Sequence, residues 1–199
     1  MHLAFAAFYC TLLMWPGLQT RPQREESDRN WQRIDQLMQQ AVQRGDLPGA
    51  VILVLHRGEV VYRKAHGLRA MKPAPEQMTV DTVFDLASLT KPIATATSIM
   101  LLAERGKLRL TDKAAAHWPE FGENGKDRIT IEQLLTHTSG LIGDNPEKDY
   151  LDGKAKALER ICQLKLIAEP GERFIYSDVG YIVLGELVQR ISGDRKSVV

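Results

Sequence analysis

In Phe84-Asp85-Leu86-Ala87-Ser88-Leu89-Thr90-Lys91, a serine and a lysine lie three residues apart at the start of a long apolar segment. This stretch holds the only S-x-x-K of the chain. Pro92 suits the first turn of a helix, and Gly106 suits its C-terminal cap. We expect a helix from Ser88 to about Arg105, deeply buried because apolar residues cover much of its circumference, namely Ile93, Ala94, Ala96, Ile99, Met100, Leu102 and Ala103.

Ser88 and Lys91 form a pair that suits nucleophilic catalysis. Residues three apart share a helix face, so the lysine ammonium can reach the serine hydroxyl. The amino end of a helix adds positive potential, which favours a developing alkoxide. Lys91 could polarise the hydroxyl or, if it is desolvated, accept its proton. An S-x-x-K also arises by chance at average residue frequencies, so a polar pair without function remains the alternative.

The segment Tyr176-Ser177-Asp178 is the second candidate element. It follows a turn at Pro170-Gly171 and leads into a helix predicted from about residue 179 to residue 191. A phenol has a reference pKa of about 10, so a tyrosine acts as a base only beside a cation such as Lys91. The alternative is a core tyrosine with a hydrogen-bonded hydroxyl, followed by Asp178 as an ordinary N-cap.

The remaining patterns predict a chain of the α/β (α+β) class. An antiparallel hairpin is expected from two β-rich runs at residues 50–55 and 60–62, and residues 70–79 are expected to form a surface loop. The other predicted helices run from Asp28 to about Arg44 and over about residues 131–135, 154–166 and 179–191. The first of them is expected to present one apolar face made of Trp31, Ile34, Leu37, Met38, Ala41 and Val42.

The amino terminus differs in composition from the rest of the chain. Residues 3–15 form an almost unbroken apolar run that is too short to span a bilayer, so residues 1–20 are interpreted as a signal peptide. A mispredicted start or an uncleaved apolar anchor are the alternatives. Residues 21–30 are charged and polar and are interpreted as a linker. Export to the periplasm or the extracellular space follows from this interpretation.

Charge and cysteine content exclude several classes of protein. The chain has 26 Lys and Arg against 25 Asp and Glu, which leaves no net field to attract nucleic acid or anionic lipid, and no stable membrane span is expected. Cys10 would leave with the signal peptide, so Cys162 is expected to be a small buried residue without a disulfide partner.

The histidines do not predict a site of their own. His56, His66, His117 and His137 show no spacing pattern typical of metal ligands. His137 and Ser139 are two residues apart in a predicted loop and need not face each other, and no G-x-S-x-G is present, so a Ser-His site is not expected.

Three segments carry a family resemblance. The segment 84–91 is the first, Leu134-Leu135-Thr136-His137-Thr138-Ser139-Gly140-Leu141 is the second, and Pro170-Gly171-Glu172-Arg173-Phe174-Ile175-Tyr176-Ser177-Asp178 is the third. Their order and approximate spacing resemble those of class C β-lactamase-like serine hydrolases and penicillin-binding proteins, including esterases and D,D-peptidases. The resemblance covers about residues 30–193. It implies an antiparallel sheet flanked by helices, together with a helical lobe.

The resemblance also implies roles for four side chains. Ser88 would be the acylated nucleophile and would supply one backbone N–H of the oxyanion hole, while Lys91 would assist proton transfer. Tyr176 would be the general base that activates Ser88 and later water. Asp178 stands where many members have asparagine, and an ionised aspartate accepts a lysine hydrogen bond but cannot donate to a substrate carbonyl.

The implied reaction is hydrolysis through an acyl-enzyme, with neither metal nor organic cofactor. The implied partners are small-molecule substrates, namely esters, β-lactams or D-amino-acid peptides. A non-catalytic binding or sensor domain of the same fold and an inactive globular fragment are the alternatives.

One motif that the resemblance implies is not found in the sequence. No Lys/His-x-Gly strand motif, which would donate the second oxyanion N–H, follows Tyr176. We therefore expect residues 31–193 to be an incomplete domain of this family, truncated before its C-terminal strands, and this chain to be inactive by itself. Residues 194–199 depart from the family pattern and are interpreted as a non-native tail, with a natural short variant as the alternative.

Overall fold

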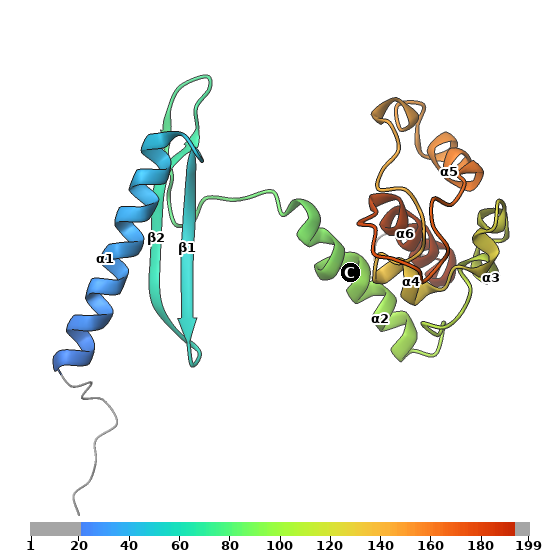
Figure 1. Ribbon diagram of the computed structural model, residues 1–199, viewed down its shortest axis with the longest axis horizontal. Helices are drawn as coiled ribbons and strands as arrows, with labels where there is room; N and C mark the ends of the chain where they lie inside the picture. The colour runs from blue at the N-terminus through green and yellow to red at the C-terminus, as the bar shows by residue number, and fades with distance from the viewer. Residues whose placement is uncertain (1–20, 194–199) are drawn as a thin grey trace, which may run out of the picture. The chain divides into compact units, whose positions relative to one another are not determined.

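The computed structural model describes the backbone of residues 21–193 (Figure 1). Side chains are described from residue 30 onward. The predicted signal peptide and the predicted non-native tail lie outside these residues. The chain divides into two compact units between Phe84 and Asp85. It mixes helices with a small antiparallel sheet, which confirms the predicted fold class.

The first unit holds the sheet of the described chain. Strands β1 (Gly49–His56), β2 (Glu59–Ala70) and β3 (Glu76–Gln77) are antiparallel in the order β1-β2-β3, so the predicted hairpin is confirmed and part of the predicted 70–79 loop forms a third strand. Arg57 and Gly58 join β1 to β2 with φ values of 50° and 84°. Two positive φ values suit the tight turn that matches the twist of a hairpin.

Helix α1 (Arg21–Arg44) packs along this hairpin (Figure 1). The indole of Trp31 stacks on the ring of Tyr62 with centroids 5.0 Å apart. The Tyr62 hydroxyl donates to Asp35 at 2.6 Å, and Lys64 donates to the other carboxylate oxygen at 2.7 Å. The predicted apolar face is therefore confirmed in part: Leu37 is 56% exposed, whereas the other five residues of that face are partly buried.

The interpretation of residues 21–30 as a linker is not supported by the backbone, because α1 already begins at Arg21. Pro22 falls in the first turn of the helix, where a proline removes no intrahelical hydrogen bond. A polar, charged composition is therefore compatible with the first turns of a long helix. No helix among residues 21–193 is long and apolar enough to cross a membrane.

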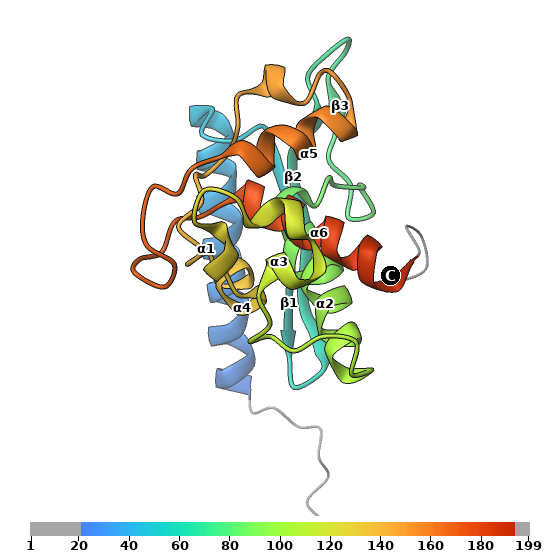
Figure 2. The same ribbon diagram turned by 90° about the vertical axis from the view of Figure 1, so that its right-hand side faces the viewer.

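The second unit is helical. Its helices are η1 (Ala87–Leu89), η2 (Lys91–Ala96), α2 (Thr97–Glu104), α3 (Ala114–His117), η3 (Pro119–Gly122), η4 (Lys126–Arg128), α4 (Ile131–Leu135), η5 (Glu147–Asp149), α5 (Lys154–Gln163) and α6 (Asp178–Ser192). Helix α6 packs against α2, α3 and α4 (Figure 2). The fully buried side chains at these contacts include Ile99, Trp118, Phe121, Ile131, Leu134, Val183 and Leu187.

The predicted helix after Ser88 is present but differs in two respects. It is a 3-10 turn, then a π-helical segment, then α2, so the backbone is irregular where the S-x-x-K lies. The prediction of deep burial is wrong for one side. Ile99 is fully buried, whereas Ile93 and Met100 are 56% and 51% exposed. Only the side of the helix that faces α6 is covered within this unit.

The second and third sequence motifs run side by side in the fold. Four backbone hydrogen bonds of 2.7–2.9 Å join residues 137–143 to residues 167–178. Gly140 allows the closest approach, because its φ is 79° and an added Cβ would lie 2.1 Å from the carbonyl oxygen of Ala168. The loop that carries Tyr176 is therefore fixed by the segment that precedes it in the chain.

Replacing Gly140 with alanine is expected to lower the free energy of unfolding by roughly 2–5 kcal/mol, since it adds overpacking to a left-handed backbone. Gly106→Ala is the matched control: Gly106 has a φ of 67° but nothing within 4 Å of the added Cβ. The control should lose only about 1–2 kcal/mol. Urea unfolding followed by circular dichroism measures both, and equal losses would contradict the steric argument.

Candidate active site

Ser88 lies on the short turn η1, immediately after a residue in an unusual conformation. Ala87 has a φ of 44°, and its N–H donates to Oδ1 of Asp85 at 2.8 Å. A non-glycine residue with positive φ is uncommon, and such strain clusters at functional sites. The turn leaves the Ser88 side chain exposed, where a substrate can reach it.

Lys91 links Ser88 to a second part of the chain. Its Nζ donates to Oγ of Ser88 at 3.2 Å and also forms a short ion pair with Oδ1 of Asp178. Burial lowers the pKa of Lys91, but hydrogen bonds to Asp178 and then to Tyr176 outweigh burial and raise the pKa above its ordinary value. Lys91 is therefore an ammonium ion across the neutral pH range.

Tyr176 lies against the same ammonium group. Nζ of Lys91 is 5.1 Å from the centroid of the Tyr176 ring, and the ring is 45% exposed. Hydrogen bonds, first to Ser88 and then to Lys91, lower the pKa of the Tyr176 phenol below its usual value. A phenol with a lowered pKa is a better proton acceptor near neutral pH.

Asp178 corrects one interpretation from the sequence. The N-cap of α6 is Ser177, whose Oγ accepts from the N–H of Gly180 at 3.0 Å and donates to the carbonyl of Ile142 at 2.6 Å. Asp178 is the first helical residue, so its carboxylate is free of the capping role and pairs with Lys91. Serine and aspartate are about equally good caps, and the contact with Lys91 explains which residue is used.

The structure also brings His137 to the site, which the sequence analysis did not expect. Its imidazole stacks on the Tyr176 ring with centroids 4.5 Å apart, and its Nδ1 accepts from the N–H of Ser177 at 2.9 Å. Its place in the second motif, 39 residues before Tyr176 by number, gave no indication of this contact. The only indication that His137 lies near the site was that it is part of segment 134–141, one of the three segments that carry the family resemblance.

The four predicted residues therefore meet in one unit of the fold. A carboxylate, an ammonium and a phenol lie in a chain of contacts that ends at the Ser88 hydroxyl. Such a chain can hold a proton away from a serine oxygen and stabilise the resulting charge. Among the described residues, no group of three or more His, Cys, Asp or Glu side chains is placed to hold a metal ion.

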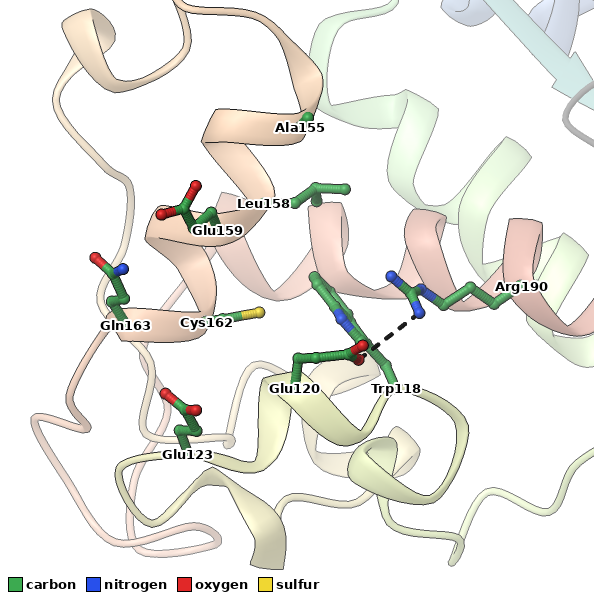
Figure 3. Close-up of a pocket in the computed structure, with 9 residues that line it drawn as sticks. All are labelled: Trp118, Glu120, Glu123, Ala155, Leu158, Glu159, Cys162, Gln163 and Arg190. Carbon is green, nitrogen blue, oxygen red and sulfur yellow. Dashed lines mark ion pairs between the residues drawn. The ribbon is translucent and has the colours of Figure 1, made fainter.

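A cavity of about 490 Å³ lies elsewhere in the second unit (Figure 3). The guanidinium of Arg190 lies 4.9 Å from the Trp118 ring and 3.9 Å from a carboxylate oxygen of Glu120. Cys162 also lines this cavity; it is buried as predicted, and burial raises the pKa of its thiol. None of the residues around Ser88 lines this cavity, so it is not part of the candidate site.

The arrangement of helices and sheet defines a fold of the β-lactamase/transpeptidase type. A sequence-family model described as "Beta-lactamase" matches residues 34–197. The chain belongs to the beta-lactamase family of hydrolases.

Relatives of known description agree with this assignment. The chain is 31% identical over 186 residues to the N-acetylmuramyl-L-alanine amidase of Bacillus subtilis strain 168, covering 84% of this chain and 42% of the relative. It is 31% identical over 216 residues to a candidate D-alanyl-D-alanine carboxypeptidase of Escherichia coli strain K12, covering 97% of this chain and 50% of the relative. It is thus similar to proteins described as an amidase and as a carboxypeptidase.

A solved structure of a class C beta lactamase superposes on the chain with a TM-score of 0.73 at 26% sequence identity. The match covers 84% of this chain and 46% of that one. The chain therefore spans about half the length of the proteins that it resembles.

Proposed function

We propose that this chain is part of a serine hydrolase that forms an acyl-enzyme at Ser88. The observation that carries the proposal is the position of the Lys91 ammonium, which donates to Oγ of Ser88 while it is ion-paired with Asp178. Since Asp178 and Tyr176 keep Lys91 protonated, the lysine stabilises negative charge and leaves the role of base to Tyr176.

The proposed steps follow from these charges. The Tyr176 phenolate takes the proton of the Ser88 hydroxyl, and Oγ attacks the carbonyl carbon of the substrate. The backbone N–H of Ser88 is one donor to the oxyanion. The leaving group then departs with the proton held by Tyr176, and the acyl group remains on Oγ. Tyr176 then takes a proton from water, whose oxygen attacks the ester carbonyl; the bond from the acyl carbon to Oγ breaks, Tyr176 returns the proton to Oγ, and the acid is released.

The proposed substrates are small esters, β-lactams or D-amino-acid amides. An ionised Asp178 offers oxygens where many relatives offer an amide, so it cannot donate a hydrogen bond to a substrate carbonyl. Two relatives are described as an amidase and as a candidate carboxypeptidase, which supports amide substrates among these classes.

The location and the boundaries of the protein belong to the same proposal. We infer export from the apolar run at residues 3–15 and assign residues 31–193 to the hydrolase domain. Among residues 21–193 we assign one oxyanion donor, the backbone N–H of Ser88. We therefore expect this chain to form a covalent adduct with a reactive probe but to release products too slowly for useful turnover.

The test is a fluorophosphonate probe, in which an oxygen–phosphorus bond forms as the phosphorus–fluorine bond breaks. The wild-type 199-residue chain should gain one adduct, mapped to Ser88 by peptide mass spectrometry, and Ser88→Ala should gain none. Ser192→Ala, at the other end of α6, is the control and should label like the wild type. No adduct on a folded chain would favour the alternative, a binding or sensor domain of the same fold.

A further inference from the structure

We propose that His137 is a positioning residue: its imidazole, with Nδ1 as the hydrogen-bond acceptor, holds Tyr176 in the orientation needed to take the Ser88 proton. The inference rests on the proposed role of Tyr176 as the base. It assigns a function to a residue that touches none of the reacting atoms.

The two residues that flank Tyr176 in the sequence are both hydrogen-bonded to His137. The N–H of Ile175 donates to the carbonyl oxygen of His137 at 2.8 Å. The N–H of Ser177 donates to Nδ1 of the same residue at 2.9 Å. One residue therefore fixes the backbone on either side of Tyr176, which limits how far the phenol can move from Lys91.

Besides these two backbone hydrogen bonds, the His137 ring contacts the Tyr176 side chain itself. It stacks on the Tyr176 ring at an interplanar angle of 28° with centroids 4.5 Å apart. Tyr181 and Phe174 also contact the imidazole, with ring centroids 5.0 Å and 5.6 Å from it. An aromatic ring in such a stack cannot rotate freely, so the Tyr176 ring has one supported orientation.

His137 itself is held in an uncommon backbone conformation, with a φ of 58°. A non-glycine residue in the left-handed region persists only where the surrounding contacts determine it, and such residues cluster at functional sites. The conformation is what allows the carbonyl and the ring of a single residue to reach Ile175 and Ser177 together.

The hydrogen bond from Ser177 defines the state of the imidazole. An acceptor Nδ1 carries a lone pair, so the ring is neutral and its proton is on Nε2. Burial and then the Lys91 charge lower the pKa of His137, while the charge of Asp178 raises it. Protonation would turn Nδ1 into a donor facing the Ser177 N–H and would set a second cation beside Lys91, so we expect Tyr176 to lose its support in acid.

The first part of the test needs no activity. Nitrogen-15 NMR of the 199-residue chain should show His137 as the neutral tautomer protonated on Nε2, with a titration midpoint below about 6.5. The Ser177 amide signal and the Tyr176 ring signal should shift together at that midpoint. A tautomer protonated on Nδ1, or a midpoint at or above 6.5, would overturn the proposal.

The second part uses two variants that separate the acceptor from the ring. His137→Asn keeps a left-handed backbone and a side-chain acceptor but removes the stack and the titration. His137→Phe keeps the stack but removes the acceptor. We expect the Phe variant to react with the fluorophosphonate probe about 10- to 100-fold more slowly at neutral pH, with the Tyr176 pKa returning toward its usual value. In the Asn variant, the Ser177 amide signal and the Tyr176 ring signal should no longer shift together as the pH is lowered.

His117→Asn is the matched control, because His117 lies on α3 with Asp112 as its partner and touches none of the site residues. It should leave the Tyr176 pKa and the labelling rate unchanged. A wild-type labelling rate in His137→Phe would overturn the positioning role. If that variant does not fold, the role is overturned when the Ser177 and Tyr176 signals of His137→Asn still shift together in acid. Absence of an adduct on Ser88, with the NMR results as expected, would instead reject the hydrolase and leave the positioning of Tyr176 intact.

Discussion

Replacing Tyr176 with phenylalanine will slow the reaction of Ser88 with the fluorophosphonate probe by roughly 100- to 10,000-fold at neutral pH, the range that loss of a positioned general base produces. The variant keeps the ring that stacks on His137 and loses only the hydroxyl. Ser88 then keeps its contact with Lys91, but Lys91 cannot take the proton, because Asp178 holds it as an ammonium ion. Labelling rates over a series of probe concentrations give the ratio.

Tyr62→Phe is the control for this experiment. Tyr62 donates its hydroxyl to the carboxylate of Asp35 and lies in the first unit of the chain. Its loss should lower stability while the labelling rate per folded molecule stays the same. A Tyr176→Phe variant that reacts within a few-fold of the wild type would show that another group accepts the proton.

Replacing Lys126 with methionine will lower the free energy of unfolding by roughly 2–5 kcal/mol, a large part of the 5–15 kcal/mol of a typical domain. Lys126 is fully buried, and its Nζ donates to the carbonyl oxygens of Cys162 and Leu164 at 2.8 Å and 2.5 Å and to that of Glu123 at 2.7 Å. Methionine fills the same space but leaves these carbonyls without that donor.

Lys148→Met controls for the general effect of removing a lysine, because Lys148 lies on the exposed turn η5. Its unfolding free energy should change by no more than about 0.5 kcal/mol. Urea unfolding compares the two variants with the wild type. Equal stabilities of Lys126→Met and Lys148→Met would mean that the three hydrogen bonds of the Lys126 ammonium contribute nothing to stability.

The sequence was sufficient to pair Ser88 with Lys91. A spacing of three residues places both on one side of any helical backbone, so the contact survives even though the segment is a 3-10 turn followed by a π-helix. Tyr176 lies 85 or more positions further along the sequence than this pair, so no local pattern predicts that it contacts them. It was expected from the family resemblance alone.

The remaining features depend on tertiary contacts. Local preferences do not separate Ser177 from Asp178 as the cap of α6, and the ion pair with Lys91 accounts for the choice. Lys126 would be assigned to the surface by composition, since lysine is almost never fully buried without partners. His137 has no sequence signal for its left-handed backbone, because that conformation follows from the chain that packs against it.

The role of Tyr176 as the base is tested by titrating its phenol, followed by the ring carbon signals in NMR and assigned with Tyr176→Phe. We expect a pKa below about 10, the usual value, because hydrogen bonds from Ser88 and then Lys91 favour the phenolate. The phenolate is then present at a lower pH than in an ordinary tyrosine. A pKa at or above 10 in the folded chain would contradict the assignment of Tyr176 as the base.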